Sequence, residues 1–121
     1  MKLAIVVLIS AVVTTPLALG ASSSRASGSA AEDQFVAAAN RGDYATVCRL
    51  YSRRYLKVSQ NSCRALYRQG ATIFGPYDYR IVRRRIMASG RRHVDLILRR
   101  HPSFIELVHE RAGWRIVAGG W

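Results

Sequence analysis

The two cysteines of this sequence could serve in several kinds of chemistry. Cys48 and Cys63 are the only cysteines among the 121 residues, and about 15 positions separate them. Such a pair can oxidise to a disulfide, remain as two buried thiols or contribute to a metal site. A zinc site needs further ligands, and no matching pair of histidines accompanies the two cysteines. The choice between a disulfide and free thiols depends on the compartment in which the protein works.

Arginine supplies most of the positive charge. The chain has 19 basic residues, of which only Lys2 and Lys57 are lysine, against 7 acidic residues, and its formal net charge is +12. Seven of the arginines lie in three runs, at residues 83–85, 91–92 and 99–100, and we assign all three to one predicted hairpin. Such a dense positive patch attracts polyanions through long-range, salt-sensitive electrostatics.

The first residues of the chain have the order of a secretory signal peptide. Lys2 is followed by an apolar run, then by Pro16 and by small residues that end at Gly20, where cleavage is expected. The alternative is a retained membrane anchor formed by residues 3–19. That run is interrupted by polar residues and by Pro16, and it is shorter than the roughly 20 residues that a spanning helix needs. Export favours a Cys48–Cys63 disulfide, which would stabilise a small domain by roughly 3 kcal/mol.

Export also changes the expected partners of the arginine runs. Nucleic acid is not expected, because the sequence has no nucleic-acid-binding motif and no series of aromatic residues beside the runs. The remaining candidates are anionic lipid head groups or another anionic component of the cell envelope, and the simplest interpretation is a solvated charged face. The sequence has no Gly-rich phosphate loop, metal cluster or nucleophile elbow, so we assign no catalytic, cofactor-binding or metal-binding residue.

The segment after the leader divides into a linker and one domain. Residues 21–31 are rich in Ser, Ala and Gly and predict a flexible linker. Residues 32–121 are enough for one small domain. Helix start and stop signals predict a helix over residues 32–40, a second from Tyr44 to about Tyr55, and a short third helix that Ser59 or Ser62 caps and Gly70 ends.

Four strands are predicted in the back half of the domain. They cover residues 79–88, 92–100, 104–110 and 114–118, with the turn between the second and third strands at His101-Pro102-Ser103. Short turns between successive strands predict an antiparallel meander. In the second strand Val94, Leu96 and Leu98 alternate with polar residues, so the two kinds of side chain should lie on opposite faces. The helices and the meander together predict an α+β domain.

Two stretches resemble the NTF2-like superfamily. Residues 35–50 (FVAAANRGDYATVCRL) are similar to its first helix, Gly-Asp turn and second helix, and residues 79–116, which end in Gly-Trp-Arg-Ile, are similar to its closing meander. The arrangement of a signal peptide followed by a pair of cysteines resembles that of small exported NTF2-like proteins of actinobacteria. The resemblance implies three N-terminal helices packed on a curved antiparallel sheet, which form a cone with an apolar pocket. It also makes a homodimer plausible, because many such sheets pair back to back.

The resemblance also defines candidates for catalysis. The superfamily includes ketosteroid isomerases and dehydratases, which use Asp, Tyr or His inside the cone. The acidic and imidazole candidates here are His93, Asp95, Glu106 and His109. None of them matches a catalytic position of the family, and if Val94 and its neighbours point into the cone then Asp95 and His93 face outwards.

The tyrosines are the candidates for contact with a ligand. Tyr44, Tyr51, Tyr55 and Tyr67 are predicted on helical faces, where they can line a pocket or simply form part of the core. We therefore expect a non-catalytic binding or scaffolding module with a pocket for a small apolar ligand. The alternatives are a small-pocket enzyme of the isomerase or dehydratase type and a basic, envelope-associated polyanion binder.

Overall fold

Within residues 27–120 three helices precede a four-stranded sheet, which confirms the predicted α+β class. The computed structural model describes residues 27–120; the predicted leader and residues 21–26 of the predicted linker lie outside this range. The elements in chain order are α2 (Gly28–Asn40), α3 (Tyr44–Arg49), α4 (Gln60–Phe74), β1 (Arg80–Ile86), β2 (Arg92–Leu98), β3 (His101–Glu110) and β4 (Gly113–Gly120).

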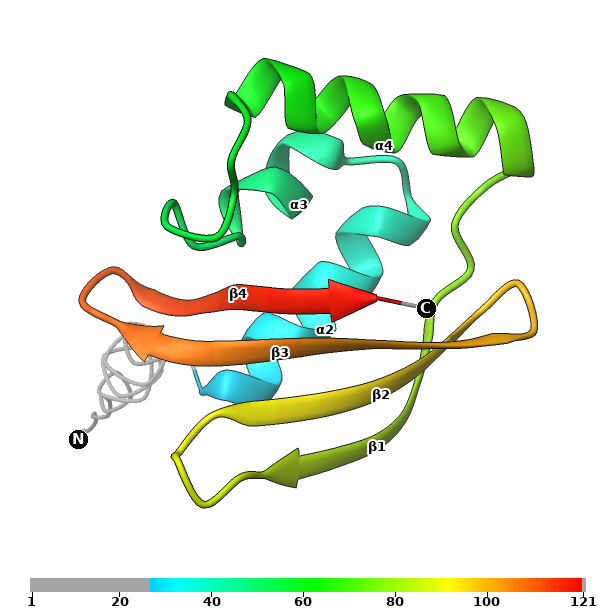
Figure 1. Cartoon of the computed structure of the whole chain (residues 1–121). Helices are drawn as coiled ribbons and strands as arrows, with labels where there is room; N and C mark the ends of the chain where they lie inside the picture. Colours follow the sequence, from blue (N-terminus) through cyan, green and yellow to red (C-terminus); the bar gives the residue numbers. More distant parts are fainter. Residues whose placement is uncertain (1–26, 121) are drawn as a thin grey trace, which may run out of the picture.

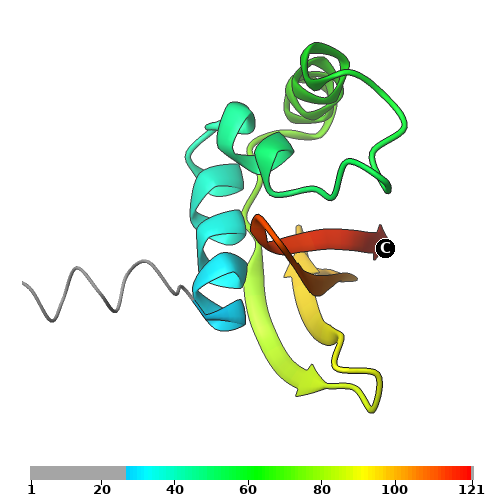
Figure 2. The ribbon, with the colours of Figure 1, turned by 90° about the vertical axis from the view of Figure 1, so that its left-hand side faces the viewer.

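The sheet is the predicted antiparallel meander. Its strand order is β1-β2-β3-β4, and the register shifts between Ile81 and Arg83 and between Glu106 and Leu107. Helix α2 runs along one face of the sheet, while α3 and α4 lie beyond the β4 edge (Figures 1 and 2). No helix in the described part of the chain covers the other face. The core therefore lies between α2 and one face of the sheet, and its β2 members are Val94, Leu96 and Leu98, as the alternation predicted.

Helix α2 begins earlier than the sequence pattern indicated. The Ser27 side chain accepts a hydrogen bond from the Ala30 backbone N–H at 3.2 Å, so this serine caps the helix and Gly28 starts it. Residues 28–31, expected as the end of the linker, form its first turn. At its other end the Asn40 amide makes two hydrogen bonds with the backbone of Tyr79, which joins α2 to the start of β1.

The prediction of a second helix as far as Tyr55 is wrong. Helix α3 ends at Arg49, because the backbone that follows pairs with β4 instead. Leu50 O accepts from Ile116 N at 2.7 Å, and Ser52 N donates to Ile116 O at 2.8 Å. Tyr51 therefore lies beside the β4 edge and not on a helical face.

Helix α4 is capped by Ser59 as predicted, but it does not end at Gly70. It continues to Phe74 and stops at Gly75, whose φ of 95° is in the left-handed region. Gly70 serves a different purpose, since a Cβ atom there would lie 2.4 Å from the Tyr77 hydroxyl oxygen. The glycine inside the helix allows Tyr77 to pack closely against it.

The turn between the second and third strands is also misplaced in the prediction. It consists of Arg99 and Arg100, with φ values of 50° and 71°, and His101 already belongs to β3. Two central residues with positive φ suit the twist of a tight hairpin. Pro102 then pairs with Ile97 as an ordinary strand residue.

The predicted disulfide is present. Cys48 of α3 and Cys63 of α4 are bonded, with their Cα atoms 6.0 Å apart. Beside the disulfide, the Gln60 side-chain amide donates to Cys48 O at 3.1 Å. The two helices are thus clamped together as expected. Within residues 27–120, none of the helices has both the length and the apolar character to cross a membrane.

Candidate functional site

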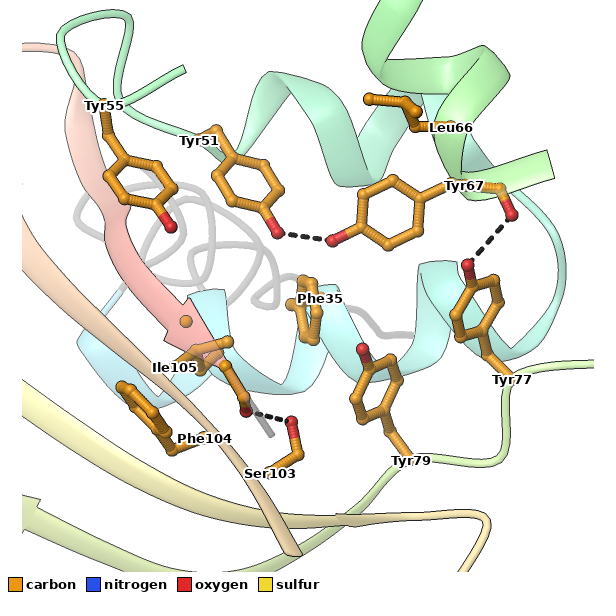
Figure 3. A pocket seen from close by; sticks show the side chains of 12 residues that line it. Phe35, Tyr51, Tyr55, Leu66, Tyr67, Tyr77, Tyr79, Ser103, Phe104 and Ile105 are labelled. Atoms are coloured by element: carbon orange, nitrogen blue, oxygen red, sulfur yellow. Dashed lines mark hydrogen bonds between the residues drawn. The ribbon is translucent and has the colours of Figure 1, made fainter. Parts of the chain in front are cut away.

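A cavity of about 500 Å³ opens between the helices and the ends of β3 and β4. Helix α2 contributes Phe35 to its wall, the segment after α3 contributes Tyr51, and α4 contributes Tyr67 (Figure 3). The other lining residues are Tyr55, Leu66, Tyr77, Tyr79, Ser103, Phe104, Ile105, Gly119 and Gly120. Since six separate segments supply the wall, the cavity exists only in the folded chain.

All six tyrosines of the chain form one group of ring contacts beside this cavity. The Tyr51 ring stacks on Tyr55 with centroids 5.8 Å apart, and its other neighbour is Tyr67 at 6.3 Å. Tyr77 stacks on Tyr79 at 5.8 Å with the ring planes 3° apart. Tyr44 completes the group by packing against Tyr67 and Tyr77. Continuous ring contact gives this wall a rigid aromatic surface.

The hydroxyl groups of this wall form a small polar network. Tyr51 and Tyr67 are hydrogen-bonded through their hydroxyls, and Tyr77 donates to Tyr67 O at 2.9 Å (Figure 3). Across the cavity Ser103 donates to Gly120 O at 2.8 Å. Each phenol carries one hydrogen, so only one of the two hydrogens in the Tyr51–Tyr67 pair is used between them. The other hydrogen is available to a ligand.

Burial keeps these phenols neutral. Loss of solvent is the main cause that raises the pKa of Tyr51, Tyr67, Tyr77 and Tyr79 above the usual value of a tyrosine. For Tyr67 the neighbouring Tyr51 adds to this shift, and the pKa of Tyr67 lies well above the usual value of a tyrosine. The cavity wall is therefore polar at its hydroxyls but uncharged near neutral pH.

The structure brings three of the four tyrosines predicted near a pocket to the cavity wall. Tyr51, Tyr55 and Tyr67 line it directly, whereas Tyr44 packs behind them. Tyr77 and Tyr79, which precede β1 and are both buried, also line the cavity but were not among the predicted pocket residues. Their spacing of two residues, with both side chains on one side of an extended segment, was the available signal.

The acid–base candidates gather elsewhere, on the sheet face that α2 does not cover. His93 Nδ1 lies 2.7 Å from Glu106 Oε2, and His93 Nε2 lies 3.0 Å from Asp95 Oδ1. Arg91 and Arg85 reach the same two carboxylates at 3.0 and 3.7 Å. The hydrogen bond from His93, followed by the one from Arg91, lowers the pKa of Glu106. Each of these groups has a charged partner, and none lines the cavity.

His109 stands apart from both groups. It is exposed, and its ring stacks on Trp114 with centroids 5.0 Å apart. Among the described residues no three His, Cys, Asp or Glu side chains are placed to hold a metal ion.

The predicted arginine hairpin is largely ion-paired. Arg92 Nε donates to Glu32 Oε2 at 2.5 Å, and Arg84 contacts Glu32 at 3.2 Å and Asp33 at 2.5 Å. Glu32 is fully buried by these contacts. Together with the pairs of Arg85 and Arg91, these bridges neutralise much of the charge that the sequence runs suggested.

Comparison with known proteins supports the architecture. No protein-family model and no curated protein matches the chain. Among solved structures, a domain of unknown function with a cystatin-like fold from Nostoc punctiforme is similar, with 16% sequence identity and a TM-score of 0.53. The similarity covers 88% of this chain and 76% of that one. The fold is therefore similar to a cystatin-like fold. At this level of identity the similarity concerns the fold alone.

Proposed function

We propose that this protein is an exported, NTF2-like binding module whose cavity takes a small, neutral, largely apolar molecule. The α+β architecture, the cystatin-like neighbour and the sequence resemblance of residues 35–50 and 79–116 support the NTF2-like assignment. The Cys48–Cys63 disulfide is consistent with an extracellular location. A binding role is consistent with the fold, with the sequence resemblance and with the disulfide.

One observation carries the choice of ligand. The wall combines aromatic rings with neutral hydroxyls, and the described lining residues include no carboxylate, imidazole or ammonium group. A volume of about 500 Å³ is in the usual range for small-molecule sites. A flat apolar molecule would stack on the tyrosine rings, and a carbonyl or hydroxyl oxygen on it would accept the spare hydrogen of the Tyr51–Tyr67 pair.

Proton-transfer chemistry of the isomerase or dehydratase type has less support. Such an enzyme needs a base within hydrogen-bond reach of its substrate. The candidates Asp95 and Glu106 are both hydrogen-bonded to His93 on the face of the sheet that α2 does not cover. The phenols of the cavity have raised pKa values, which makes them hydrogen-bonding groups and poor bases.

Titration with the neutral aromatic ketone prodan would test the proposal. Its fluorescence reports transfer from water to an apolar site, and we expect saturable binding to the full chain. Leu66→Trp adds bulk at the cavity wall from a position that is 57% exposed, so the fold should tolerate it. We expect this substitution to weaken prodan binding at least tenfold.

Ile73→Trp is the matched control for Leu66→Trp. Ile73 lies on the same helix and is 61% exposed. It does not line the tyrosine cavity, but it lines a second hollow between α4 and the β2–β3 turn, which Leu66 also borders. This variant should bind prodan as the parent does. Equal loss in both variants would place the ketone in that other hollow, and unchanged binding in both would refute the tyrosine cavity as the site.

A further inference from the structure

A second cavity gathers arginines that are scattered in the sequence. It measures about 1040 Å³ and lies between the α3–α4 loop and the β3–β4 turn; both segments can be followed in Figure 1. Five arginines line it: Arg49, Arg53, Arg54, Arg111 and Arg115. We call this cavity the arginine groove. Among its described lining residues, Glu110 is the only acidic one.

The α3–α4 loop, which carries Arg53 and Arg54, is fixed at both ends. At its start the Leu50 and Ser52 backbones pair with Ile116 of β4. At its end the disulfide and the Gln60–Cys48 hydrogen bond tie the loop to α3 and α4. The arginines on the loop are thereby held opposite those of the β3–β4 turn.

The charges in the arginine groove are not neutralised from within. Within residues 27–120, none of the five arginines forms an ion pair, in contrast to Arg84, Arg85, Arg91 and Arg92 of the β1–β2 hairpin. The Glu110 carboxylate instead accepts a hydrogen bond from Ser52 at 2.8 Å.

Hydrogen bonds to the backbone orient the guanidinium group of Arg115. Arg115 donates to Trp114 O at 2.8 Å and to Ala112 O at 3.1 Å. These two bonds to backbone carbonyls compensate no charge, so Arg115 keeps its full attraction for an anion. The groove therefore presents five arginine side chains, none of which is ion-paired within residues 27–120.

We propose that the arginine groove binds a ligand that carries two or more phosphate groups. Guanidinium groups bind phosphate oxygens in pairs of parallel hydrogen bonds, and an anion relieves the repulsion between neighbouring arginines. The apolar side chains of Leu56 and Val58 line the same cavity and would contact the non-polar part of the ligand. The phosphate groups can come from a soluble phosphate ester or from the head groups of an anionic lipid.

Calorimetric titration of the full, disulfide-bonded chain with sodium tripolyphosphate tests the site. The test variant is Arg53→Ser/Arg54→Ser/Arg111→Ser, because these three side chains are exposed and form no ion pair with another described residue. The matched control is Arg68→Ser/Arg80→Ser/Arg83→Ser, which removes the same charge from exposed positions outside the groove. Both variants should keep the circular dichroism of the parent.

We expect the test variant to bind tripolyphosphate at least tenfold more weakly than the parent, and the control to change less than threefold. Affinity should also fall as salt is added, because the attraction is electrostatic. Equal losses in the two variants would mean that binding follows net charge alone, and this result would overturn the proposal. An absence of binding to the parent at low salt would overturn it as well.

A vesicle arm distinguishes the two sources of phosphate. The parent and both variants are sedimented with phosphatidylglycerol–phosphatidylcholine vesicles, and vesicles of phosphatidylcholine alone correct for adhesion of the apolar leader. Loss of the phosphatidylglycerol-dependent fraction in the test variant only would assign lipid head groups. Tripolyphosphate binding without such a fraction would assign a soluble phosphate ester.

Discussion

Tyrosine hydroxyls determine how the cavity responds to pH. An unfolded chain releases its tyrosine protons near pH 10, whereas burial raises the pKa of Tyr51, Tyr67 and Tyr79 in the folded protein. Below about pH 10 these groups are neutral in both states. Above it the unfolded state loses the protons first, so the free energy of unfolding should decrease as pH rises.

We therefore expect fewer than six tyrosines to ionise near pH 10 while the chain is folded. Absorbance at the phenolate band during alkaline titration measures this number, and the same titration in urea should give all six. Urea unfolding on either side of about pH 10 would then show lower stability at the higher pH. Six tyrosines that ionise together near pH 10 in the folded chain would contradict the buried hydroxyl network.

Glu32 is the carboxylate whose loss should cost the most stability. It is fully buried and contacts Arg92 at 2.5 Å and Arg84 at 3.2 Å. Glu32→Ala leaves two guanidinium groups without their shared partner. We expect a loss of roughly 2 kcal/mol in urea unfolding, less than for a fully buried pair because both arginines keep some contact with water.

Asp33→Ala is the comparison for Glu32. Asp33 also contacts Arg84, but its side chain is 63% exposed. Exposed pairs contribute little, so this variant should lose less than about 0.5 kcal/mol. Similar losses for the two variants would show that the burial of Glu32 is not what makes its ion pairs important.

At the scale of the elements, local patterns predicted the meander and failed where tertiary contacts decide. Alternation in β2 and the helix cap at Ser59 are local signals, and the structure follows them. The end of α3 is different, since residues 50–55 have a helical pattern but the backbone of Leu50 and Ser52 pairs with β4. No signal within that segment indicates a partner more than 60 residues away.

The β2–β3 turn gives a sharper test of local backbone preference. Proline is a strong turn signal, so residues 101–103 were expected to turn, yet Arg99 and Arg100 adopt the positive φ angles. A left-handed backbone is unfavourable for arginine and natural for glycine. Arg100→Gly should therefore raise the free energy of unfolding by about 0.5 kcal/mol, measured in urea.

The control for Arg100→Gly is the same change in a helix. Arg68 lies in the middle of α4 and is also exposed. Glycine there should lower stability by about 1 kcal/mol relative to a good helix former. A loss of stability in both variants would mean that the backbone of Arg100 is not strained.

At the scale of the whole molecule, the arginine runs in the sequence do not coincide with the place where arginines without ion pairs gather in the described part of the folded chain. The runs at 83–85 and 91–92 dominate the sequence, but four of their arginines pair with Glu32, Asp33, Asp95 and Glu106. The five arginines of the groove come from separate segments, so the sequence does not show them as a group. The tyrosine cavity is similar, because its wall joins residues from 35 to 120. Sites of this kind form when helices and strands pack together, and the local sequence pattern does not indicate that packing.

The leader predicts both the N-terminus and the redox state of the exported chain. Expressed with its leader in a secreting bacterium, the exported protein should begin at Ala21, and Cys48 and Cys63 should resist alkylation until a reductant is added. Intact mass before and after reduction and alkylation measures both properties. A version without residues 2–20 should stay in the cytosol and should alkylate at both cysteines after rapid quenching. Exported protein with the full-length mass would instead support residues 3–19 as a retained anchor, and alkylation without reductant would contradict a disulfide in the exported form.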